Sequence, residues 1–215
     1  IKGYGVDQVR YFFLRETSFG QDGSYDHTAI VNRINADLAN GLGNLAQRSL
    51  SMIAKGFEGK VPSPDTFSAA DTELLAKADA VYRTARAAMD RQAIKGWLDA
   101  VFDLVSDANG YFAAEKPFDK ALSVERKGTI LYVTAEVVRQ VAILTAAAMP
   151  SASATLLDLL AQPAGKRSFK ALGKAGRLEA GLTLPAPVGV FPRYVDPEEP
   201  GDAKGGKGGK GMGKG

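Results

Sequence analysis

The chain has 215 residues, contains no cysteine and only one histidine, and carries a formal net charge of +3. This composition excludes a disulfide framework, a cysteine-based zinc site and a cysteine nucleophile within the chain. With 45% hydrophobic residues, the chain can bury the core of one sizeable domain. Because the sequence starts at Ile1 rather than at a methionine, we interpret it as a piece of a longer protein.

The net charge is concentrated near the C-terminus. Residues 201–215 hold four lysines against one aspartate, a net +3, so the rest of the chain balances to zero. Overall charge therefore does not identify the body of the chain as a nucleic-acid-binding protein. The lysines are Lys204, Lys207, Lys210 and Lys214.

No segment has the pattern of a signal peptide or an uninterrupted apolar run of membrane-spanning length. The most apolar stretch, residues 129–149, is interrupted by Glu136, Arg139 and Gln140. Together with the lack of cysteine, these features favour a cytoplasmic protein.

The first part of the chain predicts one short and one long helix. The short helix is expected over residues 7–16, and Asp26 or Thr28 is expected to cap the long helix over residues 29–55. Apolar residues recur along the long helix at about 3.6 residues per turn, which predicts one buried face. They are Ile30, Ile34, Leu38, Leu42, Leu45 and Ile53. In the short helix the residues expected to face inward are Val6, Val9, Phe13 and Leu14.

Further helices follow along the chain. They are predicted over residues 69–91, 94–115, 123–148 and 151–160. Ser151 is expected to cap the last of them. Long amphipathic helices with short polar connections predict an all-α fold, an antiparallel bundle of four long helices with shorter flanking helices. Proline-rich residues 181–195 are expected to form an extended strap, and Gly/Lys-rich residues 196–215 a disordered tail.

A polar face lies opposite the apolar face of the long helix. Asn40, Asn44 and Arg48 step by four residues, so they are neighbours on the helix surface. Amide and guanidinium groups supply the directional donors that read the edges of unpaired bases. An ordinary solvent-facing surface is the alternative, and periodicity alone favours it. The helix also contains Gly41 and Gly43, each costing about 1 kcal/mol relative to alanine, which indicates close approach by another helix or by RNA.

Other polar and aromatic features have structural interpretations. Asn35 falls on the apolar face, so we expect its amide to be buried and hydrogen-bonded to neighbouring backbone. Trp97 is expected to pack in a helix interface, and His27 to lie on a solvent-exposed connection. The G-x-G-x-x-A pattern that begins at Gly41 lies in mid-helix rather than after a strand, so we reject a dinucleotide site.

Several segments resemble, in the same order along the chain, parts of the methionyl-tRNA synthetase family. Residues 4–16, followed by Phe19-Gly-Gln-Asp-Gly23, resemble the stem-contact region that follows the family's catalytic signature loop. Asn35-Ala-Asp37 and Asn44-Leu-Ala-Gln-Arg48 resemble the start of the anticodon-binding helix bundle. Residues 149–157 and Phe191-Pro-Arg193 resemble its last helix and closing strap.

The resemblance implies roles for individual residues. Asn44 and Arg48 match an asparagine and an arginine that contact anticodon bases, and Asn40 and Gln47 are candidate helpers. The family carries a Pro-Trp pair after the third helix of the bundle, where this chain has Pro117-Phe118. The Phe118 ring can still stack on a base, although it has no indole N–H to donate.

The resemblance also implies an organisation. Residues 1–28 would be a stem-contact region, residues 29–195 the anticodon-binding bundle with its strap, and residues 196–215 the tail. The family's two ATP-handling signatures are absent, so we expect no catalytic residue and no metal ligand here. ATP and magnesium belong to the missing catalytic domain, and the resemblance leaves zinc open there.

We therefore expect a methionine–tRNA ligase fragment that binds tRNA(Met) and packs against the catalytic domain of the same chain, as a monomer. The tail lysines would contact tRNA phosphates, with a solubilising tail as the alternative. Two other readings remain: the bundle of a valine, isoleucine, leucine or cysteine synthetase, or a helical protein–protein module with the polar face as its rim.

Overall fold

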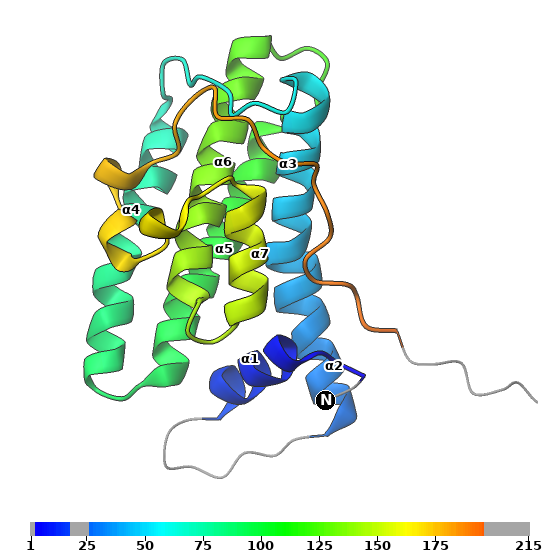
Figure 1. The fold of residues 1–215 in the computed structure, drawn as a ribbon, viewed down its shortest axis with the longest axis vertical. Coiled ribbons are helices and arrows are strands. Elements are labelled where there is room, and N and C mark those ends of the chain that lie inside the picture. The colour runs from blue at the N-terminus through cyan, green and yellow to red at the C-terminus, as the bar shows by residue number, and fades with distance from the viewer. Residues whose placement is uncertain (1–2, 18–25, 196–215) are drawn as a thin grey trace, which may run out of the picture.

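The computed structural model describes residues 3–17 and 26–195, and within these ranges it is helical (Figure 1). No strand is found among these residues apart from an isolated antiparallel bridge between Lys60 and Thr183. The predicted helical class is therefore confirmed. The α-helices are α1 (Val6–Glu16), α2 (His27–Arg33), α3 (Asn44–Gly56), α4 (Ala69–Asp90), α5 (Ile94–Glu115), α6 (Val124–Thr145) and α7 (Pro150–Leu159). A π-helical segment, η1 (Ile34–Gly43), and three short 3₁₀ turns, η2 (Ala164–Lys166), η3 (Phe169–Ala171) and η4 (Lys174–Gly176), complete the described elements.

Helix α6 forms the centre of the fold, where it contacts α3, α4, α5 and α7 (Figure 1). Every residue from Gly128 to Thr145 is buried. By length and composition α6 is the one described helix apolar enough to cross a membrane, but its most apolar window is completely buried inside the protein. Such burial is what a core helix requires, because its apolar surface is already covered by protein.

The polar residues that interrupt the α6 sequence satisfy one another in the core. Arg139 donates to Glu136 through Nε at 2.8 Å and Nη2 at 2.7 Å, and Gln140 donates to Glu136 Oε1 at 2.9 Å. Glu136 Oε2 also accepts the backbone N–H of Leu178, and Arg139 donates to the carbonyl of Ala171. This buried ion pair therefore anchors the loop that follows α7.

The predicted long helix exists as α2, η1 and α3 in sequence, and all six of its expected apolar residues are buried. Asp26 caps its start by accepting the N–H of Ala29 at 2.7 Å. The middle differs from the expectation, because η1 has i→i+5 hydrogen bonds such as that from the N–H of Asn44 to the carbonyl of Ala39.

Glycine at position 43 fits this wider turn. A Cβ atom there would lie 2.8 Å from the carbonyl oxygen of Leu38 and 3.2 Å from Cβ of Phe191. The predicted close approach is thus made within the protein, by the wide helical turn and by the C-terminal strap.

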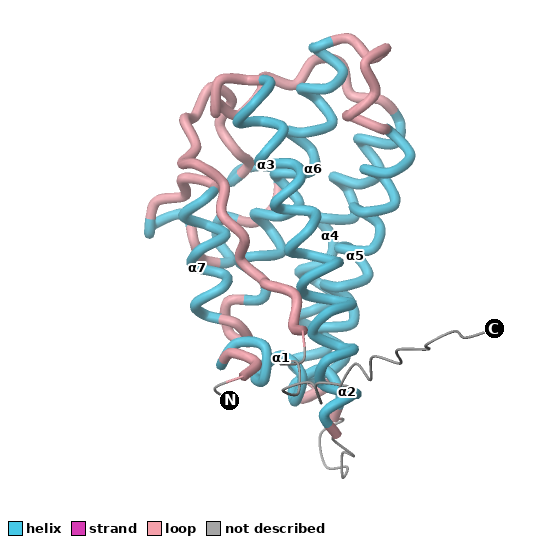
Figure 2. The backbone as a smooth tube through the Cα atoms, turned by 90° about the vertical axis from the view of Figure 1, so that its right-hand side faces the viewer, coloured by secondary structure: helices cyan, strands magenta, loops and turns pink. Residues whose placement is uncertain are grey.

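The strap runs in an extended path along α3 (Figures 1 and 2). Asn35 holds its end, since the side-chain amide donates to the carbonyl of Tyr194 at 3.0 Å and accepts its N–H at 2.8 Å. The expected backbone pairing of Asn35 is confirmed, although its partner lies 159 residues away in sequence.

Helix α1 buries the face that its sequence predicts only in part, since Leu14 packs against the core but two other members of that face do not. Val6 is 61% exposed and Phe13 is 47% exposed, whereas the buried residues are Asp7, Tyr11 and Phe12. The reason is that α1 lies across the corner between α6 and α7 (Figure 1), where polar groups are needed.

The contacts of α1 cap two other helices. Asp7 accepts the N–H of Ala152 in the first turn of α7 at 2.7 Å, and Arg10 donates to the carbonyls of Ala147 and Ala148 beyond the end of α6. Asp7, rather than the expected Ser151, therefore satisfies the start of α7, whose N-cap residue is Met149. His27 is also not on a connection: it is the first residue of α2, and its Nδ1 is hydrogen-bonded to the Tyr4 hydroxyl.

Candidate functional site

The exposed side chains of Asn44 and Arg48 lie one turn apart at the start of α3. The Arg48 guanidinium carbon is 4.8 Å from the centroid of the Phe112 ring and 6.0 Å from that of Phe118. Three segments therefore meet at this point: the start of α3, the last turn of α5 and the turn that follows α5.

The turn after α5 brings Phe118 to this place. Lys116 ends the helix in the left-handed conformation, with φ 48° and ψ 57°, and so leaves the right-handed helical region that a following proline disfavours. Pro117 is buried, and the N–H of Asp119 closes the turn on the carbonyl of Lys116 at 2.8 Å. The Phe118 side chain remains 56% exposed.

The polar groups of this surface are available to a ligand. Among the described residues, Arg48 makes no ion pair and no hydrogen bond, and the amides of Asn40 and Asn44 make no hydrogen bond within the protein. Aromatic rings hold the Arg48 guanidinium while all its N–H donors stay unused. This arrangement supplies directional donors beside an exposed ring face.

The structure does not place every candidate equally. Gln47 is half-buried and donates to Ser51 at 3.1 Å, and its Oε1 is inaccessible and has no hydrogen-bond partner in the described part of the chain. Asn40 is exposed but lies in the π-helical segment, so the ladder of four-residue steps is regular only from Asn44 to Arg48. The four tail lysines lie outside the described residues.

A buried ionic cluster supports this end of α5, and the sequence did not single it out. Tyr111 donates to Asp71 Oδ1 at 2.5 Å, and Arg126 bridges Asp71 and Glu115. Burial alone would raise the pKa of the Asp71 carboxyl, but hydrogen bonds from Arg126 and Tyr111 hold that pKa below its usual value. Burial and the bond to Asp71 raise the pKa of Tyr111.

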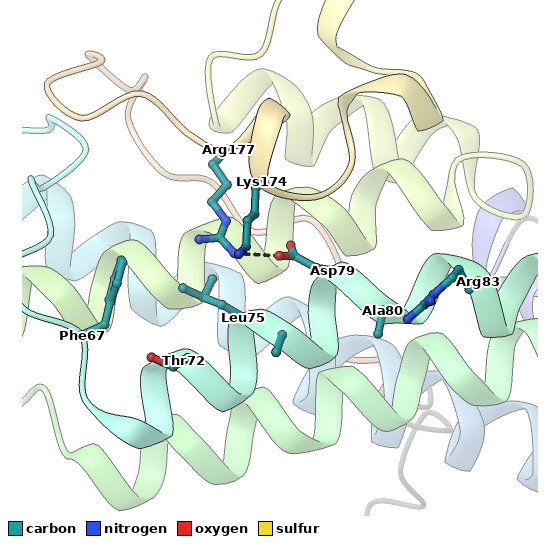
Figure 3. A pocket seen from close by; sticks show the side chains of 9 residues that line it. Phe67, Thr72, Leu75, Asp79, Ala80, Arg83, Lys174 and Arg177 are labelled. Carbon is teal, nitrogen blue, oxygen red and sulfur yellow. Dashed lines mark hydrogen bonds and ion pairs between the residues drawn. The ribbon is translucent and has the colours of Figure 1, made fainter.

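A cavity of about 480 Å³ lies elsewhere, between α4 and η4 (Figure 3). Figure 3 shows Arg177 and Lys174 reaching from the loop toward Asp79 on α4. Arg177 donates to Asp79 at 2.8 Å, and Asp79 also accepts from Gln140 at 3.1 Å. The polar groups of this cavity thus extend the buried network that anchors the loop. Within the described ranges, no cluster of His, Cys, Asp and Glu side chains could hold a metal ion.

Known proteins match this chain along nearly its whole length. The model of the family described as tRNA synthetases class I (M) matches residues 1–50. The methionine–tRNA ligase of Brucella melitensis is 56% identical over 200 residues, which are 93% of this chain and 39% of the relative. That of Mycobacterium tuberculosis is 51% identical over 201 residues, 91% of this chain and 38% of the relative. The resemblance to methionyl-tRNA synthetases is confirmed.

Solved methionyl-tRNA synthetases agree with the helical arrangement. The apo M. tuberculosis enzyme has a TM-score of 0.87 at 51% identity, covering 91% of this chain and 40% of that chain. Its complex with methionyl-adenylate has a TM-score of 0.86 at 52% identity, covering 89% of this chain and 38% of that chain. The full-length relatives are ligases, and this chain spans about two fifths of their length. Because these relatives are methionine enzymes, they favour the interpretation as part of a methionyl-tRNA synthetase over that as part of a valine, isoleucine, leucine or cysteine synthetase.

Proposed function

We propose that this chain is the part of a methionyl-tRNA synthetase that reads the anticodon of tRNA(Met). The full-length enzyme would attach methionine to its tRNA with ATP, and the ATP and methionine sites would lie outside this chain. Residues 29–195 would form the anticodon-binding bundle, and residues 1–28 would hold it against the catalytic domain. The supporting observation is the exposed pair Asn44 and Arg48, which make no hydrogen bond or ion pair among the described residues and lie beside the Phe118 ring.

The chemistry of these groups suits an unpaired base. The Asn44 amide can donate to and accept from one base edge, and the Arg48 guanidinium adds fixed donors. The Phe118 ring offers a face on which a base can stack, while Pro117 shapes the turn that presents the ring. A wrong base would leave these polar groups unpaired after water is excluded, which lowers its affinity. Asn40 and Gln47 would act as helpers.

The remaining parts of the proposal concern partners and location. The enzyme would act in the cytoplasm as a monomer, with tRNA(Met) as its macromolecular partner. Lys204, Lys207, Lys210 and Lys214 lie outside the described residues and would attract phosphates without regard to base sequence.

The test is Arg48→Ala in the full-length synthetase. Removing hydrogen bonds made by a charged group costs about 1.5–3 kcal/mol, so kcat/KM for aminoacylation should fall roughly 10- to 150-fold. Methionine-dependent ATP–pyrophosphate exchange should be unchanged, because it does not use the anticodon.

A matched control is Arg83→Ala, which removes an exposed arginine from α4 and should leave both activities unchanged. A gel shift adds a second comparison, between tRNA(Met) and the same tRNA altered only in its anticodon. Equal binding of the two RNAs would contradict the proposal and favour a protein–protein module.

A further inference from the structure

Phe112 lies directly beneath the exposed Arg48 side chain. The ring is 2% exposed, it sits in the last turn of α5, and its centroid is 4.8 Å from the guanidinium carbon. We propose that Phe112 is a positioning residue that fixes the Arg48 guanidinium on the anticodon-reading surface. This inference rests on the proposed function and goes beyond it, because Phe112 itself is too buried to touch RNA.

A mobile arginine would read a base poorly. Its long side chain has many rotamers, and ordering them on binding costs free energy. A guanidinium attracted to a fixed aromatic face is already ordered, so less is lost when a base arrives.

The ring also suits this role better than a carboxylate would. An ion pair would occupy the Arg48 donors and cancel its charge, whereas a ring contacts the flat face and leaves the in-plane N–H groups unused. Among the described residues no carboxylate pairs with Arg48. Among the described residues, aromatic rings alone therefore restrain this guanidinium.

Phe112 is itself held firmly. The N–H of Lys116 donates to the Phe112 carbonyl at 3.2 Å, which closes the last turn of α5. The neighbouring Tyr111 joins the buried cluster of Asp71 and Arg126. A rigid helix end thus transmits its position to the reading surface through the ring.

The test compares two core phenylalanines of α5 in the full-length synthetase. Phe112→Leu should raise the KM for tRNA(Met) about three- to tenfold and leave kcat and ATP–pyrophosphate exchange near the wild-type values. Phe102→Leu is the matched control: Phe102 is 7% exposed, and its ring contacts Tyr11 at 4.7 Å rather than Arg48. It should lose similar thermal stability without raising the KM.

A double variant separates positioning from general packing. In an Arg48→Ala background, Phe112→Leu should cause no further rise in KM, since there is no guanidinium left to position. Phe112→Met, which keeps side-chain bulk without a ring, should resemble Phe112→Leu.

Three results would overturn the inference. They are a normal KM for Phe112→Leu while Arg48→Ala is impaired, a further rise in the double variant, or an equal rise in Phe102→Leu. An unchanged kcat/KM for aminoacylation by Arg48→Ala would instead contradict the proposed function itself.

Discussion

Phe118 keeps more than half of its side-chain surface in solvent, although burying an aromatic ring is favourable. The left-handed turn at Lys116 and the buried Pro117 place it there, 6.0 Å from Arg48. A ring that is so exposed contributes little to the stability of the fold, and its surface is available for a base.

We therefore predict that only one of two changes at this position weakens RNA binding. Phe118→Ala should weaken binding of the tRNA(Met) anticodon stem-loop by about 1–3 kcal/mol, because a stacking face is lost. Phe118→Trp should bind at least as well as wild type, since it enlarges that face. Fluorescence anisotropy with labelled RNA measures both.

The control for this prediction is Phe169→Ala, which removes a ring that is 50% exposed on η3 and contacts Tyr82. It should leave RNA affinity unchanged, and both alanine variants should change the free energy of unfolding by less than about 0.5 kcal/mol. Equal RNA affinity of Phe118→Ala and wild type would remove the ring from the reading surface.

The sequence predicts those candidate residues that their spacing or their polarity within a single helix makes conspicuous. Asn44 and Arg48 stand out because four-residue steps place them together, and Asn35 because an amide on an apolar face needs a partner. Phe112 could not be found in this way, since a phenylalanine on the inner face of a helix is ordinary core. Only the packing of α5 against α3 places it under Arg48.

At the scale of elements, the π-helical segment shows what periodicity can and cannot resolve. Ile30, Ile34, Leu38 and Leu42 are spaced by four, more than the 3.6 residues of an α-helical turn, which fits the wider turn of η1. Either kind of turn buries these residues, so the pattern predicts the correct face. It does not separate the two hydrogen-bonding schemes.

Two glycine-to-alanine substitutions should change the free energy of unfolding in opposite directions. Gly43→Ala should destabilise the fold by about 1–3 kcal/mol, because its Cβ would meet the Leu38 carbonyl at 2.8 Å and Phe191 at 3.2 Å. Gly110→Ala lies on an exposed part of α5, where the new Cβ would have no atom within 4 Å apart from its chain neighbours and the backbone of its own helix, and it should stabilise the fold by about 1 kcal/mol. Urea unfolding monitored by circular dichroism measures both, and a stabilising Gly43→Ala would contradict the assigned role of the wide turn.

Helix α1 departs from the sequence prediction at Val6 and Phe13 for a physical reason. A prediction from hydrophobic periodicity takes the apolar face of a helix to be the buried one. In α1, however, Asp7 and Arg10 face the protein and hydrogen-bond to backbone groups at the start of α7 and beyond the end of α6. Those ends come together only in the folded chain. No pattern within residues 6–16 therefore reveals them.

At the scale of the whole molecule, polar networks join segments that are far apart in sequence. Glu136 and Arg139 on α6 bind the backbone of the loop at Leu178 and Ala171. In the sequence these charges appear only as interruptions of an apolar run. Their partners are set by tertiary packing. The periodicity of the sequence therefore predicts the helices better than it predicts the loops packed around them.

The cluster around Asp71 joins three helices and makes stability depend on pH. Its carboxylate is fully buried, caps α4 through the N–H of Ser68 at 2.8 Å, and binds Tyr111 of α5 and Arg126 of α6. Because these partners lower the folded-state pKa of Asp71, the unfolded chain binds this proton at the higher pH. The contribution to stability is thus complete above the unfolded pKa of about 3.9 and is lost as the pH falls through the folded pKa.

Asp71→Asn should lower the free energy of unfolding at pH 7 by about 2–3 kcal/mol, because Arg126 and Tyr111 lose a charged acceptor. As the pH is lowered from 5 to below about 3, the variant should also lose less stability than wild type, because it has no Asp71 carboxylate to protonate. Asp103→Asn, an exposed change on α5, should keep the wild-type profile. Urea unfolding across this pH range measures all three proteins. Parallel acid limbs for Asp71→Asn and wild type would show that the coupling resides in other carboxylates.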